Sequence, residues 1–342
     1  MEKNIKEQAH TYFSPFDEPF RIEGMPFQKE NGNAFHRLLA LKNYSEGVDF
    51  NAACSSGIRI CFSTDAENIV IKATVHRATA APHMTVYGAF GFDVSVVSPS
   101  EKRWVATVNP ERGESDMKAD VVLPQGLKNV VIAMPQYAKV EDVFIGIPKD
   151  STITAASFSY SIDRPIVFYG SSITHGASAS RSGTGFPALV AGHFNSDYIN
   201  FGFSGSAKGE VSVANDIAEV SMSAFVMEYD HNADSPESLK DTHYPFYMII
   251  REAHPQIPFV MLSRISGGFS ISEEESAERA KIIEKTYIKA KENGDENVFF
   301  INGGTLSDKY SKENMLVDGI HPNDLGMRVI ADAIIEKLKE IH

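Results

Sequence analysis

Four short segments in the second half of the sequence carry the residue types that a serine needs to cleave an ester. They are residues 170–174 (Gly-Ser-Ser-Ile-Thr), 200–205 (Asn-Phe-Gly-Phe-Ser-Gly), 230–233 (Asp-His-Asn-Ala) and 318–322 (Asp-Gly-Ile-His-Pro). Such cleavage requires a nucleophile, a base that accepts its proton, a group that orients the base, and donors that stabilise the oxyanion. Together the four segments offer a candidate for every one of these roles.

Each role can be assigned to a particular residue. Ser172 is predicted to attack the ester carbonyl, and His321 to accept its proton and return it to the leaving alcohol. Asp318 lies three residues before His321, so its carboxylate can reach the far ring nitrogen and fix the tautomer. The backbone N–H groups of Ser172 and Gly205, with the side-chain amide of Asn232, are predicted to form the oxyanion hole.

Several other polar residues fall near these segments and have two possible roles. His175 and His231 are predicted either to line the substrate pocket or to support it through hydrogen bonds. Arg264 either contacts the substrate or lies at the surface, and a structural role is favoured for His243. The histidines lack the spacing of a metal site, so neither a metal nor another cofactor is expected.

The elements that must position the four segments alternate between strand and helix after residue 164. Short apolar runs predict strands at residues 166–169, 198–201, 224–227, 259–262 and 298–301. Apolar periodicity and helix-end residues predict helices near residues 186–194, 211–219, 243–254, 273–292 and 324–340. This alternation is typical of an α/β fold with a parallel sheet covered on both faces, whose reactive edge is at the carboxyl ends of the strands.

The first half of the chain shows a different pattern, in which short β-type runs are separated by turn residues. Strands are predicted at residues 58–63, 69–75, 84–87, 92–97, 104–108, 119–123, 130–134 and 143–147. Regular short strands of this kind favour a β-sandwich of jelly-roll type. Two domains are therefore expected, residues 1–163 and 164–342, and the first is assigned a structural or substrate-rim role, with independent sugar binding as the alternative.

The order of the four segments resembles that of the GDSL/SGNH hydrolase superfamily, whose sequence blocks contribute Ser, Gly, Asn and His. These match Ser172, Gly205, Asn232 and His321. The resemblance implies a three-layer α/β/α, flavodoxin-like SGNH domain. It also implies that the β-sandwich is similar in layout to the domain that precedes the SGNH domain in some carbohydrate esterases and in a few acyltransferases.

Two positions depart from the family pattern. Ser171 stands where the family usually has Asp, and residues 230–233 replace the usual Gly-x-Asn-Asp. Ser171 is therefore an alternative nucleophile, although the register of the block favours Ser172, and Asp230 is a candidate to replace the missing carboxylate. The α/β-hydrolase fold is not favoured, since no Gly-x-Ser-x-Gly is found in residues 170–174 or 202–206.

The expected function is removal of a small acyl group, acetyl first, from a carbohydrate ester through an acyl-enzyme. Acyl transfer to an alcohol acceptor and non-catalytic carbohydrate binding are the alternatives. The formal net charge of -13 argues against nucleic acid as a partner, and no apolar stretch approaches the length of a membrane span. With no secretory signal at residues 1–10 and two cysteines, Cys54 and Cys61, a cytoplasmic location is expected. The oligomeric state is not predicted.

Overall fold

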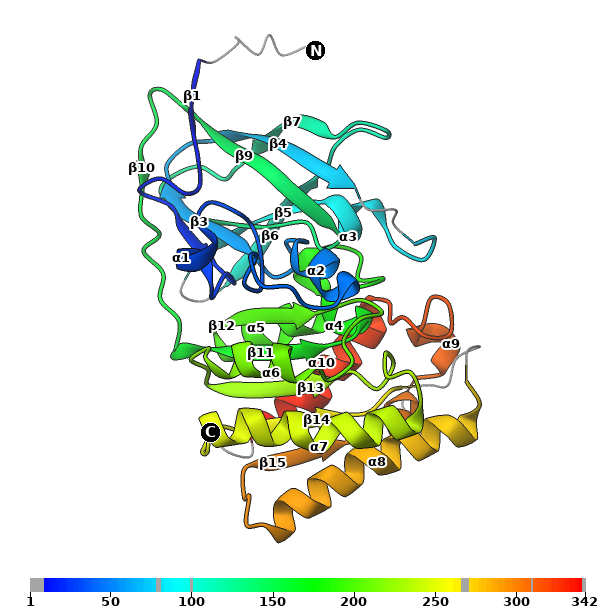
Figure 1. The fold of residues 1–342 in the computed structure, drawn as a ribbon. Helices are drawn as coiled ribbons and strands as arrows, with labels where there is room; N and C mark the ends of the chain where they lie inside the picture. Colours follow the sequence, from blue (N-terminus) through cyan, green and yellow to red (C-terminus); the bar gives the residue numbers. More distant parts are fainter. Residues whose placement is uncertain (1–8, 78–80, 99–100, 266–270, 309, 340–342) are drawn as a thin grey trace.

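The computed structural model describes residues 9–77, 81–98, 101–265, 271–308 and 310–339, which fold into two stacked parts (Figure 1). A β-rich part formed by the first half of the chain lies above an α/β part formed by the second half in this view. Within the described ranges, no helix is both long enough and apolar enough to cross a membrane.

Two antiparallel sheets form the β-rich part. The first has the strand order β1 (His10–Phe13), β9 (Ala138–Pro148), β4 (Asn68–Arg77), β7 (Asp116–Val122). The second has the order β10 (Ile153–Thr154), β3 (Arg59–Thr64), β8 (Lys128–Ala133), β5 (Phe92–Val97), β6 (Lys102–Val108), and β2 (Arg21–Glu23) pairs with β3. Ile71 of the first sheet and Ile60 and Ile132 of the second belong to one apolar core. The predicted all-β fold of this half is confirmed.

One predicted strand of this half is wrong. Residues 84–87 were expected to be extended, but residues from Val86 onward form helix α3 (Val86–Phe90). The side chain of Thr85 accepts a hydrogen bond from the backbone N–H of Gly88 at 2.8 Å, which caps the helix. Two further short helices, α1 (Gln28–Asn31) and α2 (Glu46–Ala52), were not predicted either. Helices of one or two turns are too short to show an apolar period.

A parallel five-stranded sheet forms the centre of the α/β part, as predicted. Its strand order is β12 (Ser196–Gly202), β11 (Ile162–Gly170), β13 (Ala224–Glu228), β14 (Phe259–Leu262), β15 (Val298–Ile301). Gly170 at the end of β11 is in register with Gly202 of β12 and with Glu228 of β13. The segments that follow these three strands therefore meet at one edge of the sheet.

Helices cover both faces of this sheet. They are α5 (Phe186–Phe194) and α10 (Asp324–Lys339) on one face and α6 (Val211–Ala218), α7 (Pro236–Ala253) and α8 (Glu273–Glu292) on the other. Because neighbouring residues of a strand point to opposite faces, Phe168 of β11 packs in the core with α5 and α10, whereas Tyr169 packs in the core with α6 and α7. Helix α7 begins earlier than predicted, since Ser235 accepts a hydrogen bond from the N–H of Ser238 and caps it.

The two parts of the molecule are joined through buried polar contacts. Arg37, from the first half, is completely buried. Its Nη1 donates to the carbonyl oxygens of Asn200 and Gly202, each at 2.8 Å, at the end of β12. Tyr137, also from the first half, donates from its hydroxyl to the carbonyl oxygen of Ser172 at 3.2 Å. The β-rich part thus contacts the sheet edge at which the predicted site lies.

Candidate active site

The sharp turn between β11 and the short helix α4 (Ser172–His175) positions Ser172. Gly170 is required here, because a Cβ atom at this position would lie 2.1 Å from the carbonyl oxygen of Glu228. Ser171 is the N-cap of α4, and its hydroxyl accepts a hydrogen bond from the N–H of Ile173 at 3.1 Å. Ser172 is consequently the first residue of the helix at the carboxyl end of β11.

Ser172, His321 and Asp318 form one continuous chain of hydrogen bonds. The Oγ of Ser172 lies 2.8 Å from Nε2 of His321, and Nδ1 of His321 lies 2.8 Å from Oδ2 of Asp318. This geometry allows a proton to pass from the serine hydroxyl to the imidazole while the carboxylate fixes the other ring nitrogen. The three residues come together although Ser172 and Asp318 are far apart in sequence.

The second oxygen of Asp318 is held by the loop itself. Oδ1 accepts hydrogen bonds from the backbone N–H groups of Ile320 at 3.0 Å and His321 at 2.8 Å. Partial burial raises the pKa of this carboxyl, but these donors and the imidazole outweigh it and lower the pKa to about 2. Asp318 therefore remains ionised at every pH at which an esterase would be assayed.

The predicted oxyanion donors follow the two strands that flank β11. Gly205 lies in the turn after β12 with φ +70°, a left-handed conformation that favours glycine. Asn232 lies after β13, where its N–H donates to the carbonyl oxygen of Tyr229 at 2.9 Å. The order of the strands places both segments beside the turn of Ser172. Their role in binding an oxyanion stays a prediction.

Glu228, the last residue of β13, places a carboxyl group against the turn that carries Ser171 and Ser172. Its oxygens accept hydrogen bonds from the Ser171 hydroxyl at 2.9 and 3.0 Å and from the Thr174 hydroxyl at 2.9 Å. Burial, followed by the nearby charge of Asp230, raises the pKa of Glu228 to about 8. Since the hydroxyl of Ser171 is bound to Glu228 and caps α4, its position favours Ser172 as the nucleophile.

Asp230, the candidate to replace the missing family carboxylate, lies next to Glu228 but bonds to a different segment. Its Oδ2 accepts a hydrogen bond from the backbone N–H of Arg264 at 3.1 Å. Burial raises the pKa of Asp230, and the charge of Arg264 opposes the rise. Glu228 was missed because nothing in the sequence distinguishes it from an ordinary residue at the end of a strand.

His83 is a second residue near the site that the sequence did not identify. Its ring lies flat against the ring of His321, with a centroid distance of 4.1 Å and an interplanar angle of 6°. His83 comes from the β-rich half, in the loop between β4 and α3. The first half of the chain therefore contributes a side chain that touches the predicted base.

The structure separates the two roles considered for His175 and His231. His175 is completely buried, stacks on Tyr137 at 4.1 Å and bonds through Nε2 to the carbonyl oxygen of Gln136 at 2.7 Å, contacts that agree with the supporting role. His231 is partly exposed, and its Nε2 has no hydrogen-bond partner among the described residues. Burial, with the charge of Arg264, lowers the pKa of His231 well below its usual value.

Arg264 and His243 are both buried. Arg264 is only 4% exposed, which excludes the surface position considered for it and leaves it beside Asp230. His243 bonds through Nδ1 to the hydroxyl of Thr286 at 3.0 Å, between α7 and α8. This contact agrees with the structural role that is expected for His243.

Among the residues that the structure describes, two groups of side chains bring possible metal-ligand atoms within 4.8 Å of one another. They are His83, Asp318 and His321, and Glu228, Asp230 and His231. In both groups, carboxylate oxygens and the Nδ1 of the base already take part in hydrogen bonds within the protein, as described above. In the first group, these bonds position Ser172 and His321 for proton transfer.

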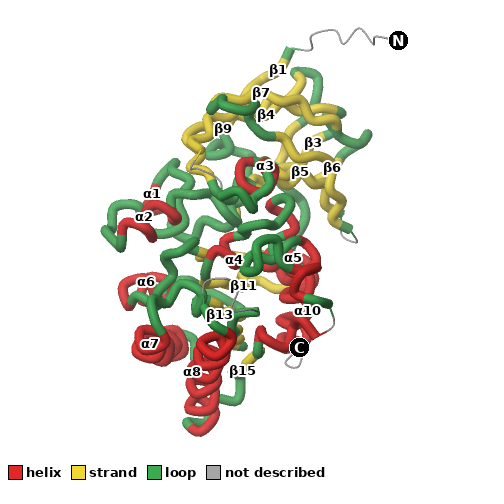
Figure 2. The backbone as a smooth tube through the Cα atoms, turned by 90° about the vertical axis from the view of Figure 1, so that its right-hand side faces the viewer, coloured by secondary structure: helices red, strands yellow, loops and turns green. Residues whose placement is uncertain are grey.

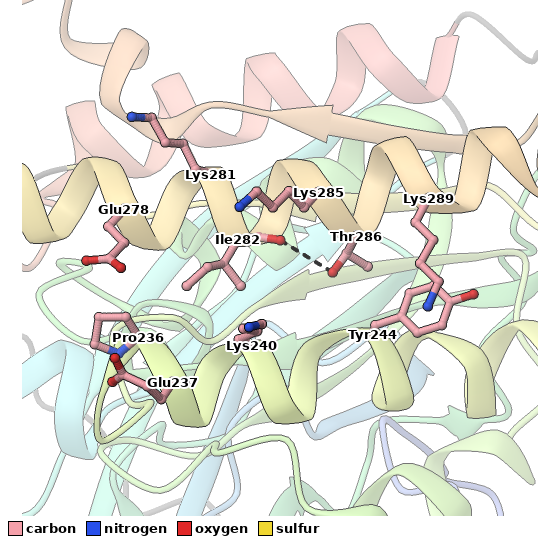
Figure 3. A pocket seen from close by; sticks show the side chains of 10 residues that line it. All are labelled: Pro236, Glu237, Lys240, Tyr244, Glu278, Lys281, Ile282, Lys285, Thr286 and Lys289. Carbon is pink, nitrogen blue, oxygen red and sulfur yellow. Dashed lines mark hydrogen bonds between the residues drawn. The ribbon is translucent and has the colours of Figure 1, made fainter.

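A groove between α7 and α8 lies apart from this site (Figure 3). It has a volume of about 580 Å³, and its walls carry four lysines, Lys240, Lys281, Lys285 and Lys289. The ammonium group of Lys289 lies over the ring of Tyr244, 3.6 Å from its centroid. None of the predicted site residues is among those that line the groove, so we do not assign the chemistry to it.

Structural comparison relates the whole chain to proteins of known structure. A protein from Bacteroides ovatus described as a GDSL-like lipase is 26% identical, with a TM-score of 0.85 over 97% of this chain and 98% of that chain. The salicylyl-acyltransferase SsfX3 from a tetracycline biosynthetic pathway is 19% identical, with a TM-score of 0.78 over 97% of both chains. The acetyl xylan esterase Est2A from the rumen bacterium Butyrivibrio proteoclasticus is 12% identical, with a TM-score of 0.58 over 97% of this chain and 98% of that chain. The acyltransferase and the acetyl xylan esterase are similar to this chain in fold.

Sequence comparison assigns both halves of the chain. A search of curated proteins gives no match. Residues 10–153 match the family described as the N-terminus of Esterase_SGNH_hydro-type, and residues 163–339 match the GDSL-like lipase/acylhydrolase family. Because the second match alone spans more than half of the sequence, the chain belongs to the GDSL-like lipase/acylhydrolase family and is a carboxylic ester hydrolase.

Proposed function

We propose that the protein is a serine esterase in which Ser172, His321 and Asp318 act as the catalytic triad. The observation that carries this proposal is the pair of 2.8 Å hydrogen bonds that joins the three side chains. A serine at the carboxyl end of a central strand, with its hydroxyl on a histidine whose other nitrogen faces a carboxylate, is arranged for nucleophilic attack.

The proposed reaction proceeds in two steps through an acyl-enzyme. In the first, Oγ of Ser172 bonds to the ester carbonyl carbon while Nε2 of His321 takes the hydroxyl proton. The tetrahedral intermediate then expels the alcohol, which receives that proton from His321. In the second, a water attacks the acyl-serine and gives a proton to His321. The bond between the acyl carbon and Oγ then breaks, Oγ of Ser172 receives that proton from His321, and the carboxylic acid is released. During both steps the oxyanion accepts hydrogen bonds from the N–H groups of Ser172 and Gly205 and from the amide of Asn232.

For the substrate we propose a carbohydrate ester that carries a small acyl group, with acetyl as the first candidate. This is supported by the likeness of the whole chain, β-rich half included, to the fold of an acetyl xylan esterase. A deacetylation screen over acetylated xylan, acetylated mannan and simple acetyl sugars, compared with esters of longer acyl chains, tests it. A preference for long acyl chains would contradict the proposed substrate.

The esterase assignment itself is tested with p-nitrophenyl acetate. We expect Ser172→Ala to abolish turnover and the matched variant Ser171→Ala to retain a measurable part of it, because Ser171 caps the helix without touching His321. Equal rates for wild type and Ser172→Ala would overturn the assignment. If Ser171→Ala abolished turnover and Ser172→Ala retained it, Ser171 and not Ser172 would be the nucleophile.

Acyl transfer to an alcohol other than water is the second candidate. This candidate is supported by the likeness of the chain to the fold of a salicylyl-acyltransferase over 97% of both chains. The same acyl-enzyme would serve, and only the molecule that attacks in the second step would differ. Product analysis at low acceptor concentration separates the two, since a transfer product that exceeds hydrolysis would support the transferase. Non-catalytic carbohydrate binding is not retained, because the chain belongs to a family of hydrolases.

A further inference from the structure

We propose that His83, supplied by the β-rich half, is a positioning residue that holds the imidazole of His321 in the orientation needed for proton transfer with Ser172. The inference rests on the proposed function, since it assigns a partner to the base of the proposed triad. Its starting point is the parallel contact of the two rings, with centroids 4.1 Å apart and planes 6° apart.

The two hydrogen bonds of His321 leave one motion of its ring unopposed. One bond runs from Nε2 to Ser172 and the other from Nδ1 to Asp318, so both lie in the ring plane. Neither strongly resists a tilt of the ring about the line that joins the two partners. A flat ring stacked on one face of the imidazole blocks that tilt, because the atoms would collide. His83 thus supplies the restraint that the triad itself lacks.

His83 can act in this way because it is itself fixed to the catalytic half. Its Nδ1 lies 2.8 Å from Oγ of Ser178, and the hydroxyl of Ser178 donates to the carbonyl oxygen of His83 at 3.2 Å. Both bonds are satisfied at once only if the proton of the ring is on Nδ1. The hydroxyl of Thr85 donates to the carbonyl oxygen of Ser180 at 2.8 Å, and α3, which follows, lies on the side of the β-rich part that faces the α/β part (Figure 2).

The backbone conformation of Ser178 indicates that its contact with His83 has a function. Its φ is +65°, in the left-handed region that residues other than glycine rarely adopt, and such residues persist where the surrounding contacts enforce them. Ser180, two residues on, donates from its backbone N–H to Asp324 at 2.8 Å, at the start of the helix that follows the His321 loop. The same short segment therefore connects His83 with the loop that carries the base.

Stacking against His321 requires that His83 be uncharged when His321 carries a proton. His321 becomes a cation when it accepts the serine proton, and a neutral aromatic face beside it attracts that charge. Partial burial and the charge of His321 lower the pKa of His83, whereas Asp318, whose Oδ2 is 4.0 Å from Nε2 of His83, raises it. Burial prevails, so His83 remains neutral at neutral pH and does not repel the imidazolium.

Four variants test the proposal with p-nitrophenyl acetate. His83→Ala removes the ring and is expected to lower kcat roughly ten- to hundredfold with KM little changed, the scale typical of a misplaced reacting group. His83→Phe keeps a flat ring and is expected to recover kcat to within about threefold of wild type. Ser178→Ala, which removes the partner of His83 Nδ1 but keeps the ring, should lower kcat less than His83→Ala does. His76→Ala changes an exposed histidine of β4 and should match wild type.

Two results would overturn the positioning role while leaving the proposed function intact. They are a kcat of His83→Ala equal to that of wild type, and a His83→Phe variant as slow as His83→Ala, since the ring face would then not be what matters. Absence of turnover in wild type would instead count against the proposed function.

A readout independent of turnover is the NMR signal of the proton on Nδ1 of His321, which faces Asp318. The proposal expects this signal to broaden or vanish in His83→Ala and to persist in His83→Phe, with circular dichroism unchanged in both. Its persistence in a folded His83→Ala protein would refute the proposal. Because the signal does not depend on turnover, it decides the matter even for a protein that cleaves none of the esters tried.

Discussion

Replacing Glu228 by glutamine removes an acidic group from beneath the nucleophile while preserving its shape. In wild type the carboxyl is 2% exposed, and it accepts hydrogen bonds from the hydroxyls of Ser171 and Thr174. Burial and the charge of Asp230 raise its pKa from 4.5 to about 8. A raised pKa means that the folded protein retains a proton which the unfolded chain would release.

The sign and size of the effect on stability follow from this difference. Below pH 4.5 Glu228 is protonated in both the folded and the unfolded state, so its contribution to the free energy of unfolding is fully present there. This contribution is lost as the pH rises through the folded pKa of about 8. One pKa unit corresponds to about 1.4 kcal/mol, so between pH 5 and pH 8 the free energy of unfolding should fall by as much as about 4 kcal/mol through this group alone. Glu228→Gln carries no titrating proton and should not show this fall.

Urea unfolding at pH 5, 6.5 and 8 measures the effect directly. For each protein the free energy of unfolding is plotted against pH, and the slope for wild type is compared with the slope for Glu228→Gln. The other titrating groups contribute equally to both slopes, so the difference between the slopes reports Glu228 alone. Glu252→Gln changes an exposed glutamate of α7 and should keep the wild-type slope. If wild type and Glu228→Gln lose stability in parallel, Glu228 is ionised in the folded state at neutral pH and the reasoning from burial is wrong.

Three further substitutions have expected outcomes. Asp318→Asn should lower kcat by roughly 10²- to 10⁴-fold, because an amide cannot hold the required tautomer as a carboxylate does; an unchanged kcat would mean that serine and histidine act as a pair. Asn232→Ala should lower kcat by roughly 10²- to 10³-fold if its amide binds the oxyanion, and a change in KM alone would assign it to substrate binding. Arg37→Met should lower the free energy of unfolding by about 3 kcal/mol, measured in urea, because the carbonyl oxygens of Asn200 and Gly202 lose their buried donor; an unchanged midpoint would contradict this.

The central sheet could be predicted from the sequence because its strands are short apolar runs buried on both faces. Val226 of β13 and Val260 of β14, for example, are almost completely buried, so no polar residue interrupts the pattern. The segments that follow such strands necessarily meet at one sheet edge, which is why the segments of Ser172, Gly205 and Asn232 could be expected to lie together. Strand 84–87 failed because Thr85 caps a helix, a local hydrogen bond that outweighs the β-type character of the neighbouring residues.

Other parts of the site depend on contacts that sequence order does not encode. His83 lies in an ordinary loop of the other half of the chain, and only the packing of the two halves brings it to His321. Glu228 could be recognised only once β13 was known to lie next to β11. His175 was assigned to the pocket as one possibility because it is three residues from Ser172, but the helix turns it inward onto Tyr137.

The β-rich half contacts each of the segments that carry the proposed catalytic residues. Arg37 fixes the end of β12, from which the segment of Gly205 emerges, and Tyr137 donates to the carbonyl oxygen of Ser172 itself. His83 stacks on the base of the same triad. Each of these contacts is made to the backbone or to a ring of the reacting segments, so a shift of one half relative to the other would move the nucleophile, the oxyanion loop and the base together. A domain that only captured substrate would leave those three elements unaffected, which is why substitutions at this junction should change kcat more than KM.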